Sequence, residues 1–196
     1  IDGLNTLVIG YYSIITIIIY KINLLSVIPI DSGLVLSWIL LLLFIYLLNL
    51  INRLFLGDSG AYFLGFSYAI LLIMIHNKNL SVSPFFIILL LWYPGFEILF
   101  SIIRKINSKI SPLSPDTEHL HQIIFIYLNR TFFKKKIYAN IISANIINLY
   151  NIIIFCIAIN DVSKTGLQIM LIMINISIYI ITYFTLIKNY KLSSKS

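Results

Sequence analysis

Three short polar stretches interrupt an otherwise apolar sequence, and each places groups that could do chemistry at close spacing. GDSG, residues 57–60, sets Asp58 between two glycines. A carboxylate is a hard oxygen ligand of the kind Mg²⁺ takes, usually together with substrate phosphates, and flanking glycines let the backbone approach closely. Asp58 or Ser59 could equally cap a helix expected to begin near Ala61. The motif leaves both roles open.

The first five residues, IDGLN, form a second polar stretch. On a helix, Asp2 and Asn5 would share one face and present a carboxylate beside an amide. Capping of the following helix is the alternative explanation for both side chains. The stretch alone does not choose between a binding role and a structural one.

The third stretch, SPDTEHLHQ at residues 114–122, combines prolines, acids and two histidines in a basic loop. The prolines interrupt any helix, and Asp116 or Thr117 could cap a new one. His119 and His121 could hydrogen-bond phosphate oxygens. A shared zinc site is disfavoured, because a spacing of two points the rings in different directions and no cysteine lies nearby. A solvated loop with incidental histidines stays open as the structural alternative.

The composition identifies the setting in which these groups act. Hydrophobic residues make up 60% of the 196 residues, charged residues only 11%, and the mean hydropathy is +0.98. A water-soluble globule of this length could not bury so much apolar surface, so the sequence predicts a membrane protein. The net charge of +7 suits anionic lipid headgroups or an anionic substrate, and nucleic acid is not expected as a partner. A single cysteine, Cys156, excludes an intramolecular disulfide framework.

Six continuous apolar runs are long enough to cross or nearly cross a bilayer, which takes roughly 17–25 residues. Because they are continuous rather than alternating, they predict helices instead of barrel strands. We therefore expect an all-α, polytopic transmembrane bundle with a single integral membrane domain over residues 1–196. Since the chain begins at Ile1 and enters a polar motif directly, we interpret it as the C-terminal part of a longer protein. The expected helices are residues 4–20, 34–50, 61–75, 85–103, 137–159 and 167–187, with a polar loop at 104–136.

The basic residues predict the orientation of this bundle. Placing the 104–136 loop in the cytoplasm puts eleven of the fourteen lysines and arginines on that side, which the positive-inside rule favours. Only Lys21, Lys78 and Lys164 then lie outside. The three polar stretches consequently share the cytoplasmic face. Glu97, near the same end of the fourth run, is interpreted as structural, paired with Arg104 or with a neighbouring helix.

Four motifs together resemble the polyprenyl-phosphate N-acetylhexosamine-1-phosphate transferases, glycosyltransferase family 4 of bacteria. They are IDGLN, FLGDSGAYFLGF at residues 55–66, YPGFEILFSIIRK at 93–105, and SPDTEHLHQ. The order of the motifs and their shared face are those of the family. The similarity is close over about residues 1–130 and extends to the last two runs only as hydropathy. The HLHQ sequence resembles the antigen-initiating branch more than the peptidoglycan translocase, which has three consecutive histidines.

The resemblance implies a reaction, its cofactor and its participants. A polyprenyl (undecaprenyl) phosphate attacks a UDP-N-acetylhexosamine in the bacterial inner membrane, and UMP leaves, as the first membrane step of cell-envelope polysaccharide synthesis. By the resemblance, Asp2 and Asp58 are catalytic, with Asp58 binding Mg²⁺ (Mn²⁺ being an alternative). Asn5, His119 and His121 bind the nucleotide-sugar. Arg104 and Lys105 are candidate phosphate contacts, and a homodimer is an open alternative.

The chain also departs from the family pattern. Thr6 replaces the glycine usual after the first motif, which we expect to alter the dihedrals of that loop, and Gln122 replaces a third histidine. The family's adjacent pair of aspartates lies upstream of IDGLN and does not occur here, so half an active site is expected. Activity is therefore predicted for a parent protein rather than for this piece. An inactive family remnant, a membrane scaffold and a transporter are the alternatives.

Overall fold

The computed structural model describes residues 3–112, 114 and 116–193, and all regular secondary structure in these ranges is helical. The predicted all-α fold is confirmed. Each of the six apolar runs forms helix, although the fourth is broken in two and a further helix lies in the polar loop. The elements are α1 (Leu7–Lys21), a 3-10 turn η1 (Leu24–Val27), α2 (Ser32–Leu50), α3 (Gly57–Lys78), α4 (Pro84–Leu90), α5 (Trp92–Asn107), α6 (Leu120–Thr131), α7 (Lys136–Ala158) and α8 (Thr165–Ser193).

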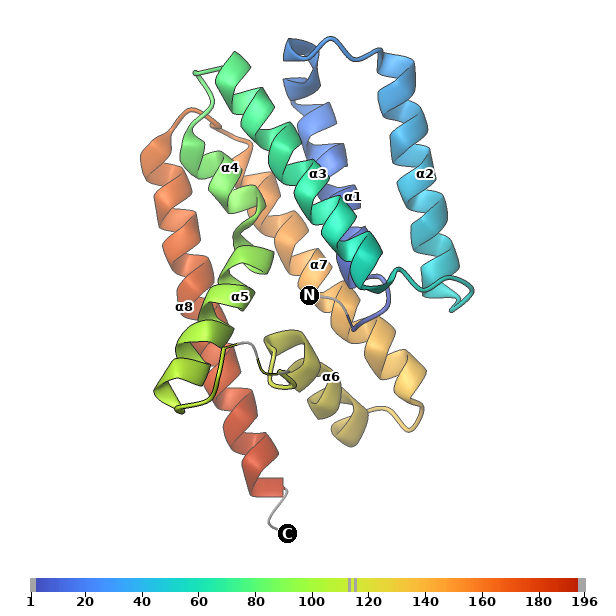
Figure 1. The fold of residues 1–196 in the computed structure, drawn as a ribbon, viewed down its shortest axis with the longest axis vertical. Helices are drawn as coiled ribbons and strands as arrows, with labels where there is room; N and C mark the ends of the chain where they lie inside the picture. The colour runs from blue at the N-terminus through green and yellow to red at the C-terminus, as the bar shows by residue number, and fades with distance from the viewer. Residues whose placement is uncertain (1–2, 113, 115, 194–196) are drawn as a thin grey trace.

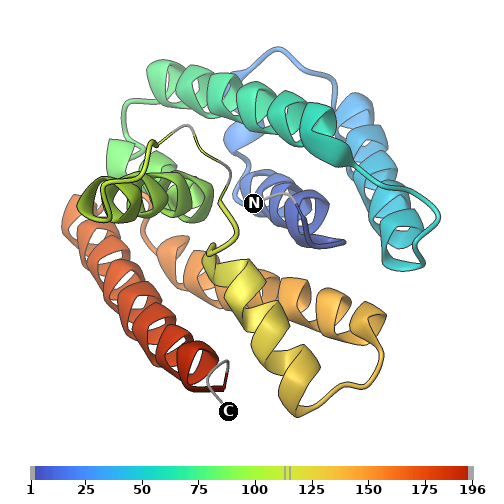
Figure 2. The same ribbon diagram turned by 60° about the horizontal axis from the view of Figure 1, so that its bottom comes forward.

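Helix α1 is the centre of the bundle (Figures 1 and 2). It packs against α2, α3 and α7, and most of its side chains are buried. A helix that is apolar on all sides belongs in a core, and LVIGYYSIITIIIYK has this character. With 15 residues it is shorter than a typical span of about 20 residues. The helices around it therefore contribute most of the outer surface.

Four described helices are long and apolar enough to cross a membrane: α2, α3, α7 and the Thr165–Lys188 part of α8. Counting α4 and α5 together as one bent span makes five. Their outer faces carry large exposed apolar side chains, such as Leu40 and Phe44 on α2. Such faces suit a hydrocarbon environment and would be unfavourable in water. The chain is thus built as a multi-pass membrane protein.

The fourth apolar run bends by 74° between α4 and α5. Pro94 has no N–H, so the carbonyl of Leu90 lacks its helical partner four residues on. The hydroxyl of Tyr11 donates to that carbonyl instead, at 2.9 Å. Because Tyr11 is fully buried in α1, the central helix stabilises the break. The bend redirects α5 toward the end of the bundle at which α1 and α3 begin (Figure 1).

Helix α6 lies inside the segment expected to be a loop, and it packs against α7 and α8. It begins after His119, whose backbone N–H donates to Gln122 Oε1 at 3.3 Å. The expected caps, Asp116 and Thr117, are therefore wrong for this helix. Asp116 instead accepts from the N–H of Glu118, at 3.0 Å, in the turn that leads into α6.

The described parts of the three predicted polar stretches lie toward one end of the bundle. In Figure 1, α1 and α3 begin at their lower ends, near the middle of the view, and the connection from α5 to α6 lies below that level. The view in Figure 2 brings this end forward, with α6 beside the starts of α1 and α7. That this end faces the cytoplasm stays a prediction from the basic residues.

Candidate functional site

Asp58 and His119 line one cleft, although 61 positions of sequence separate them. The cleft has an accessible volume of about 660 Å³ and lies between α1, α3 and α5. Its walls are mostly apolar and aromatic, and Asp58 and His119 are its two ionisable side chains apart from the tyrosines. A polar end beside an apolar wall suits a ligand with a charged head and a hydrocarbon body.

Asp58 lies in the first turn of α3, which begins at Gly57 after the N-cap residue Leu56. The alternative that Asp58 or Ser59 caps a helix starting near Ala61 is therefore not what the structure has. The Asp58 side chain is exposed, and it makes no hydrogen bond or ion pair with the residues that the structure describes. Gly57 has φ +66°, a left-handed conformation that glycine adopts without strain. The free carboxylate is open to a ligand.

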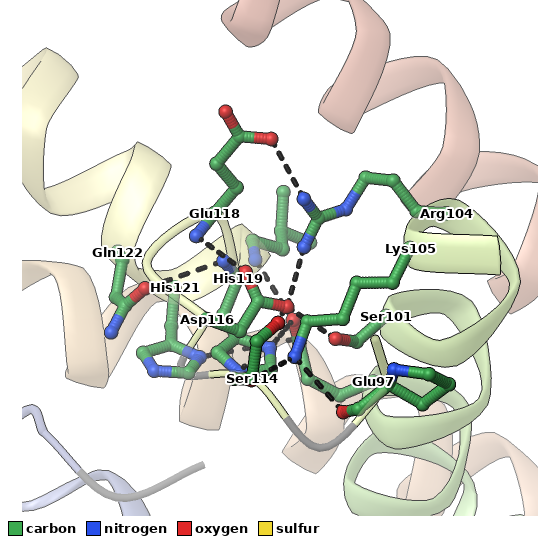
Figure 3. Close-up of polar contacts among 12 residues, drawn as sticks. Glu97, Ser101, Arg104, Lys105, Ser114, Asp116, Glu118, His119, His121 and Gln122 are labelled. Carbon is green, nitrogen blue, oxygen red and sulfur yellow. Dashed lines mark hydrogen bonds and ion pairs between the residues drawn. The ribbon is translucent and has the colours of Figure 1, made fainter. Parts of the chain in front are cut away.

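His119 is held on the opposite wall by a buried carboxylate. Its Nδ1 lies 3.1 Å from Oε1 of Glu97, which is 1% exposed (Figure 3). Its other ring nitrogen, Nε2, lies 3.8 Å from Oδ2 of Asp116, which is too long for a hydrogen bond. Of the two pairings expected for Glu97, the one with Arg104 is wrong, because Glu97 faces the histidines instead. The alternative, a pairing with a neighbouring helix, is confirmed by the contacts of Glu97 with the start of α6 and with α8.

Arg104 and Asp116 hold the loop that carries His119. Arg104 donates to Asp116 Oδ2 at 2.5 Å and to Glu118 Oε2 at 2.7 Å, and Ser101 donates to Asp116 as well (Figure 3). Partial burial alone would raise the pKa of the Asp116 carboxyl, but the hydrogen bonds from Arg104 and Ser101 outweigh it and hold the pKa well below its usual range. The carboxylate is thus a stable anchor for the loop.

Lys105 fastens the same loop from the next position of α5. Its Nζ donates to the carbonyl oxygens of Pro112, at 3.2 Å, and Ser114, at 2.5 Å, and the residue is 7% exposed. Arg104 and Lys105 were candidates for phosphate contact. In this structure both side chains are engaged with the protein, so they support the loop rather than line the cleft.

His121 is fully buried beneath His119. The two rings lie parallel, with centroids 5.4 Å apart, and His121 Nδ1 is 4.0 Å from Oε2 of Glu97. The spacing of two, expected to separate the rings, brings them together because His119 lies before the first turn of α6 and His121 within it. His121 does not line the cleft, whereas the His119 side chain is 22% exposed.

Asn5 lies away from the cleft, in a layer of asparagines at the start of α1. Its backbone N–H donates to Asn140 Oδ1 at 2.8 Å, and its side chain donates to Asn52. Thr6 has φ +69°, a left-handed conformation that costs a residue with a Cβ roughly 1 kcal/mol. The expected effect of this replacement on the dihedrals of the family's loop stays a prediction. Asp2 lies outside the described residues.

The ligands expected for a metal are sparse in this part of the protein. Among the described residues, no three His, Cys, Asp or Glu side chains gather as a metal site. Asp58 alone offers a carboxylate to the cleft. Mg²⁺ is commonly held by one or two carboxylates with waters and substrate phosphates, so Asp58 fits as one ligand of such an ion.

Sequence reasoning missed Tyr179 of α8, whose hydroxyl donates to Glu97 Oε1 at 2.9 Å. It also treated Glu97 as structural without linking it to the histidines. The position of Glu97, an ionisable residue within an apolar run, was a signal that it belongs to a functional site. Nothing in the sequence of α8 distinguished Tyr179 from the chain's twelve other tyrosines.

Comparison with known proteins identifies relatives of part of this chain. Over 76 residues, the chain is 34% identical to the probable undecaprenyl-phosphate N-acetylglucosaminyl 1-phosphate transferase of Bacillus subtilis strain 168. This match covers 38% of this chain and 21% of that protein. The resemblance to this family is confirmed. Undecaprenyl-phosphate alpha-N-acetylglucosaminyl 1-phosphate transferases of Thermotoga maritima and Escherichia coli K12 are 32% identical over 71 residues and 31% over 73. These matches cover 36% and 37% of this chain, and 23% and 20% of the relatives.

The match spans about a fifth of the length of each of these relatives. No protein-family profile and no solved structure matches the chain.

Proposed function

We propose that this chain is part of an enzyme that transfers N-acetylhexosamine-1-phosphate from a UDP-sugar to polyprenyl phosphate and releases UMP. A phosphate oxygen of the lipid attacks the sugar-bearing phosphorus, and the bond from that phosphorus to UMP breaks. The observation that carries the proposal is the cleft that Asp58 and His119 share at one end of a membrane bundle. The names of the relatives support the same reaction class.

The apolar wall of the cleft supports a lipid acceptor. Tyr62 and Phe66, both on α3, are 75% and 70% exposed, and Ile98 on α5 is 59% exposed. In a bilayer such side chains already contact acyl chains, so a polyprenyl chain can take the place of a lipid against them without exposing apolar surface to water. A polyprenyl chain lying on this wall would bring its phosphate to the polar end of the cleft.

Asp58 is the residue that would hold Mg²⁺ at this end. When bound, the ion supplies charge neutralisation between the phosphates of donor and acceptor. Mn²⁺ has similar ligand preferences and is the alternative. The remaining ligands would come from phosphate oxygens and water.

His119 is suited to contact a phosphate through Nε2, because Nδ1 is already engaged by Glu97. Its loop is anchored before substrate arrives, so little freedom is lost when a phosphate binds. Phosphoryl transfer asks the protein mainly for positioning and electrostatic stabilisation, which such a fixed ring provides. The catalytic role of Asp2 and the nucleotide-sugar contacts of Asn5 and His121 stay predictions from the resemblance.

The enzyme is proposed to reside in the bacterial inner membrane, with the cleft at the cytoplasmic face. The basic residues support this orientation, and a UDP-sugar would reach the cleft from that compartment. The product would be the first lipid-linked intermediate of a cell-envelope polysaccharide.

The test is UMP release from UDP-N-acetylglucosamine by the complete parent protein with undecaprenyl phosphate. His119→Ala should lower kcat/KM for the UDP-sugar about 10- to 100-fold, the scale of a lost hydrogen bond to a charged phosphate. His76→Ala is the matched control, because His76 contacts the Val82 carbonyl far from the cleft, at 3.0 Å. Absence of UMP release from a folded parent protein would favour a non-catalytic scaffold.

A further inference from the structure

The carboxylate of Glu97 joins three elements that are far apart in the sequence. Its Oε1 accepts hydrogen bonds from Nδ1 of His119 at 3.1 Å, from the backbone N–H of Leu120 at 2.9 Å, and from the hydroxyl of Tyr179 at 2.9 Å. Glu97 belongs to α5, Leu120 begins α6, and Tyr179 belongs to α8. One oxygen atom therefore fixes the start of α6 against two helices.

The chemistry of these groups fixes the proton on His119. An ionised carboxylate only accepts hydrogen bonds, so the imidazole nitrogen facing it must carry a hydrogen. His119 is therefore an Nδ1–H donor, and Nε2 is the nitrogen left for a ligand. The carboxylate also sets the rotation of the ring, because the hydrogen must point at Oε1.

Burying the charged carboxylate of Glu97 costs free energy, so the charge itself should serve the site. The residue is 1% exposed, and its second oxygen, Oε2, makes no hydrogen bond among the described residues, although Nδ1 of the buried His121 lies 4.0 Å away. A neutral acceptor would satisfy the N–H of Leu120 without the cost of desolvating a charge. A negative charge is useful where the histidine must keep one tautomer, as a buried carboxylate does for a catalytic histidine in the Ser-His-Asp triad.

We propose that Glu97 is the positioning residue of His119 and that Tyr179 sets the position of Glu97. The proposal rests on the proposed function only in that His119 Nε2 is taken to contact a phosphate. It assigns α8 a part in the site, although the four family motifs lie outside that helix. Tyr179 acts through Glu97 and does not line the cleft.

The first experiment observes the tautomer directly, by nitrogen NMR of histidine-labelled protein in detergent. The chain has three histidines, so single substitutions assign the signals. His119 should be protonated at Nδ1 in the unsubstituted protein. In Glu97→Gln the side-chain amide also offers N–H donors, and the Nε2–H form that free histidine prefers should become populated. A single Nδ1–H form in both proteins would overturn the proposal.

The second experiment is a double-substitution cycle on transfer activity in the complete protein. Glu97→Gln should lower kcat/KM about 10- to 100-fold, and Tyr179→Phe about 3- to 10-fold, the scales of a charged and an ordinary hydrogen bond. In a His119→Ala background both substitutions should cost less than about threefold, because there is no ring left to position. Undiminished losses in that background would overturn the proposal and leave Glu97 a structural group.

Tyr183→Phe is the matched control for Tyr179→Phe. Tyr183 lies one turn further along α8, its ring is parallel to that of Tyr179, and it is equally buried at 2% exposure. Its activity should equal that of the unsubstituted protein. If the complete protein releases no UMP, the proposed function fails, while the NMR experiment still decides the role of Glu97.

Discussion

The two walls of the cleft differ in how their polar groups are satisfied. On the α5–α6 wall, the charged side chains all have partners. Glu97 contacts His119, and Arg104 forms ion pairs with Asp116 and Glu118. On the α3 wall, Asp58 is exposed and has no polar partner among the described residues. One wall is preorganised by the protein itself, whereas the other leaves a carboxylate free.

The difference indicates where a ligand contributes most. Charges that are already paired lose their partners or their water when a ligand enters, so they gain little from it. A carboxylate without a protein partner gives up only water when a cation binds, so it gains more from the cation than a paired one does. We therefore assign loop architecture to Arg104, Lys105 and Asp116, and cation binding to Asp58.

The largest expected effect concerns the side of the membrane on which the two walls lie. In a Cys156→Ser background of the complete protein, cysteines at Ser59 and Ser114 should be shielded from an impermeant thiol reagent in intact cells. A cysteine at Ser81, an exposed residue at the other end of the bundle, should react fully. Labelling at Ser59 or Ser114 without labelling at Ser81 would show that the bundle has the opposite orientation.

The same substitution in the α5–α6 wall and at an exposed position outside the cleft should differ in its effect on the free energy of unfolding. Arg104→Ala leaves the Asp116 carboxylate, whose side chain is 8% exposed, without its cation and should destabilise the protein by about 2 kcal/mol. Arg53→Ala, on the exposed connection before α3, should have little effect. Thermal unfolding in detergent measures both. Equal melting temperatures for the two variants would mean that the α5–α6 wall is not held by its ion pairs.

A smaller effect should appear in the pH dependence of stability. Because the pKa of Asp116 is lowered in the folded protein, its contribution is complete above the unfolded pKa of about 3.9 and is lost as the pH falls through the folded pKa. Asp116→Asn should therefore melt below the unsubstituted protein by a constant margin from pH 5 to 7, and the margin should narrow below about pH 4.

Ser101→Ala is the intermediate case, because it removes one donor to Asp116 and keeps Arg104. Its margin at neutral pH should be smaller than that of Asp116→Asn. A margin for Asp116→Asn that does not change down to pH 3 would refute the anchoring role of this carboxylate.

The helices were largely predictable from the sequence, because continuous apolar runs in a membrane leave the backbone few alternatives. The break between α4 and α5 was not predictable, because it depends on Pro94 together with Tyr11, which is far away in the sequence and donates to the Leu90 carbonyl. Helix α6 was not predicted, because its mixture of polar and apolar residues was interpreted as part of a loop.

The candidate site was predictable only in part. Asp58 and His119 were predicted to lie on the same face of the membrane, and the structure shows that they line one cleft. The partner of His119 was not predicted, because Glu97 is 22 positions away and the bend of α5 determines what it faces. Tyr179 depends on the packing of α8, which no short motif encodes.

The most direct test of the account is the Asp58→Asn variant of the complete protein, assayed for UMP release from UDP-N-acetylglucosamine with polyprenyl phosphate across a range of Mg²⁺ concentrations. Asp31→Asn is the control, because Asp31 caps α2 by accepting from the Gly33 N–H at 3.0 Å and asparagine caps equally well. We expect Asp58→Asn to fold and insert normally but to lose nearly all transfer, while Asp31→Asn stays active. Robust turnover by Asp58→Asn with an unchanged Mg²⁺ dependence would contradict this expectation.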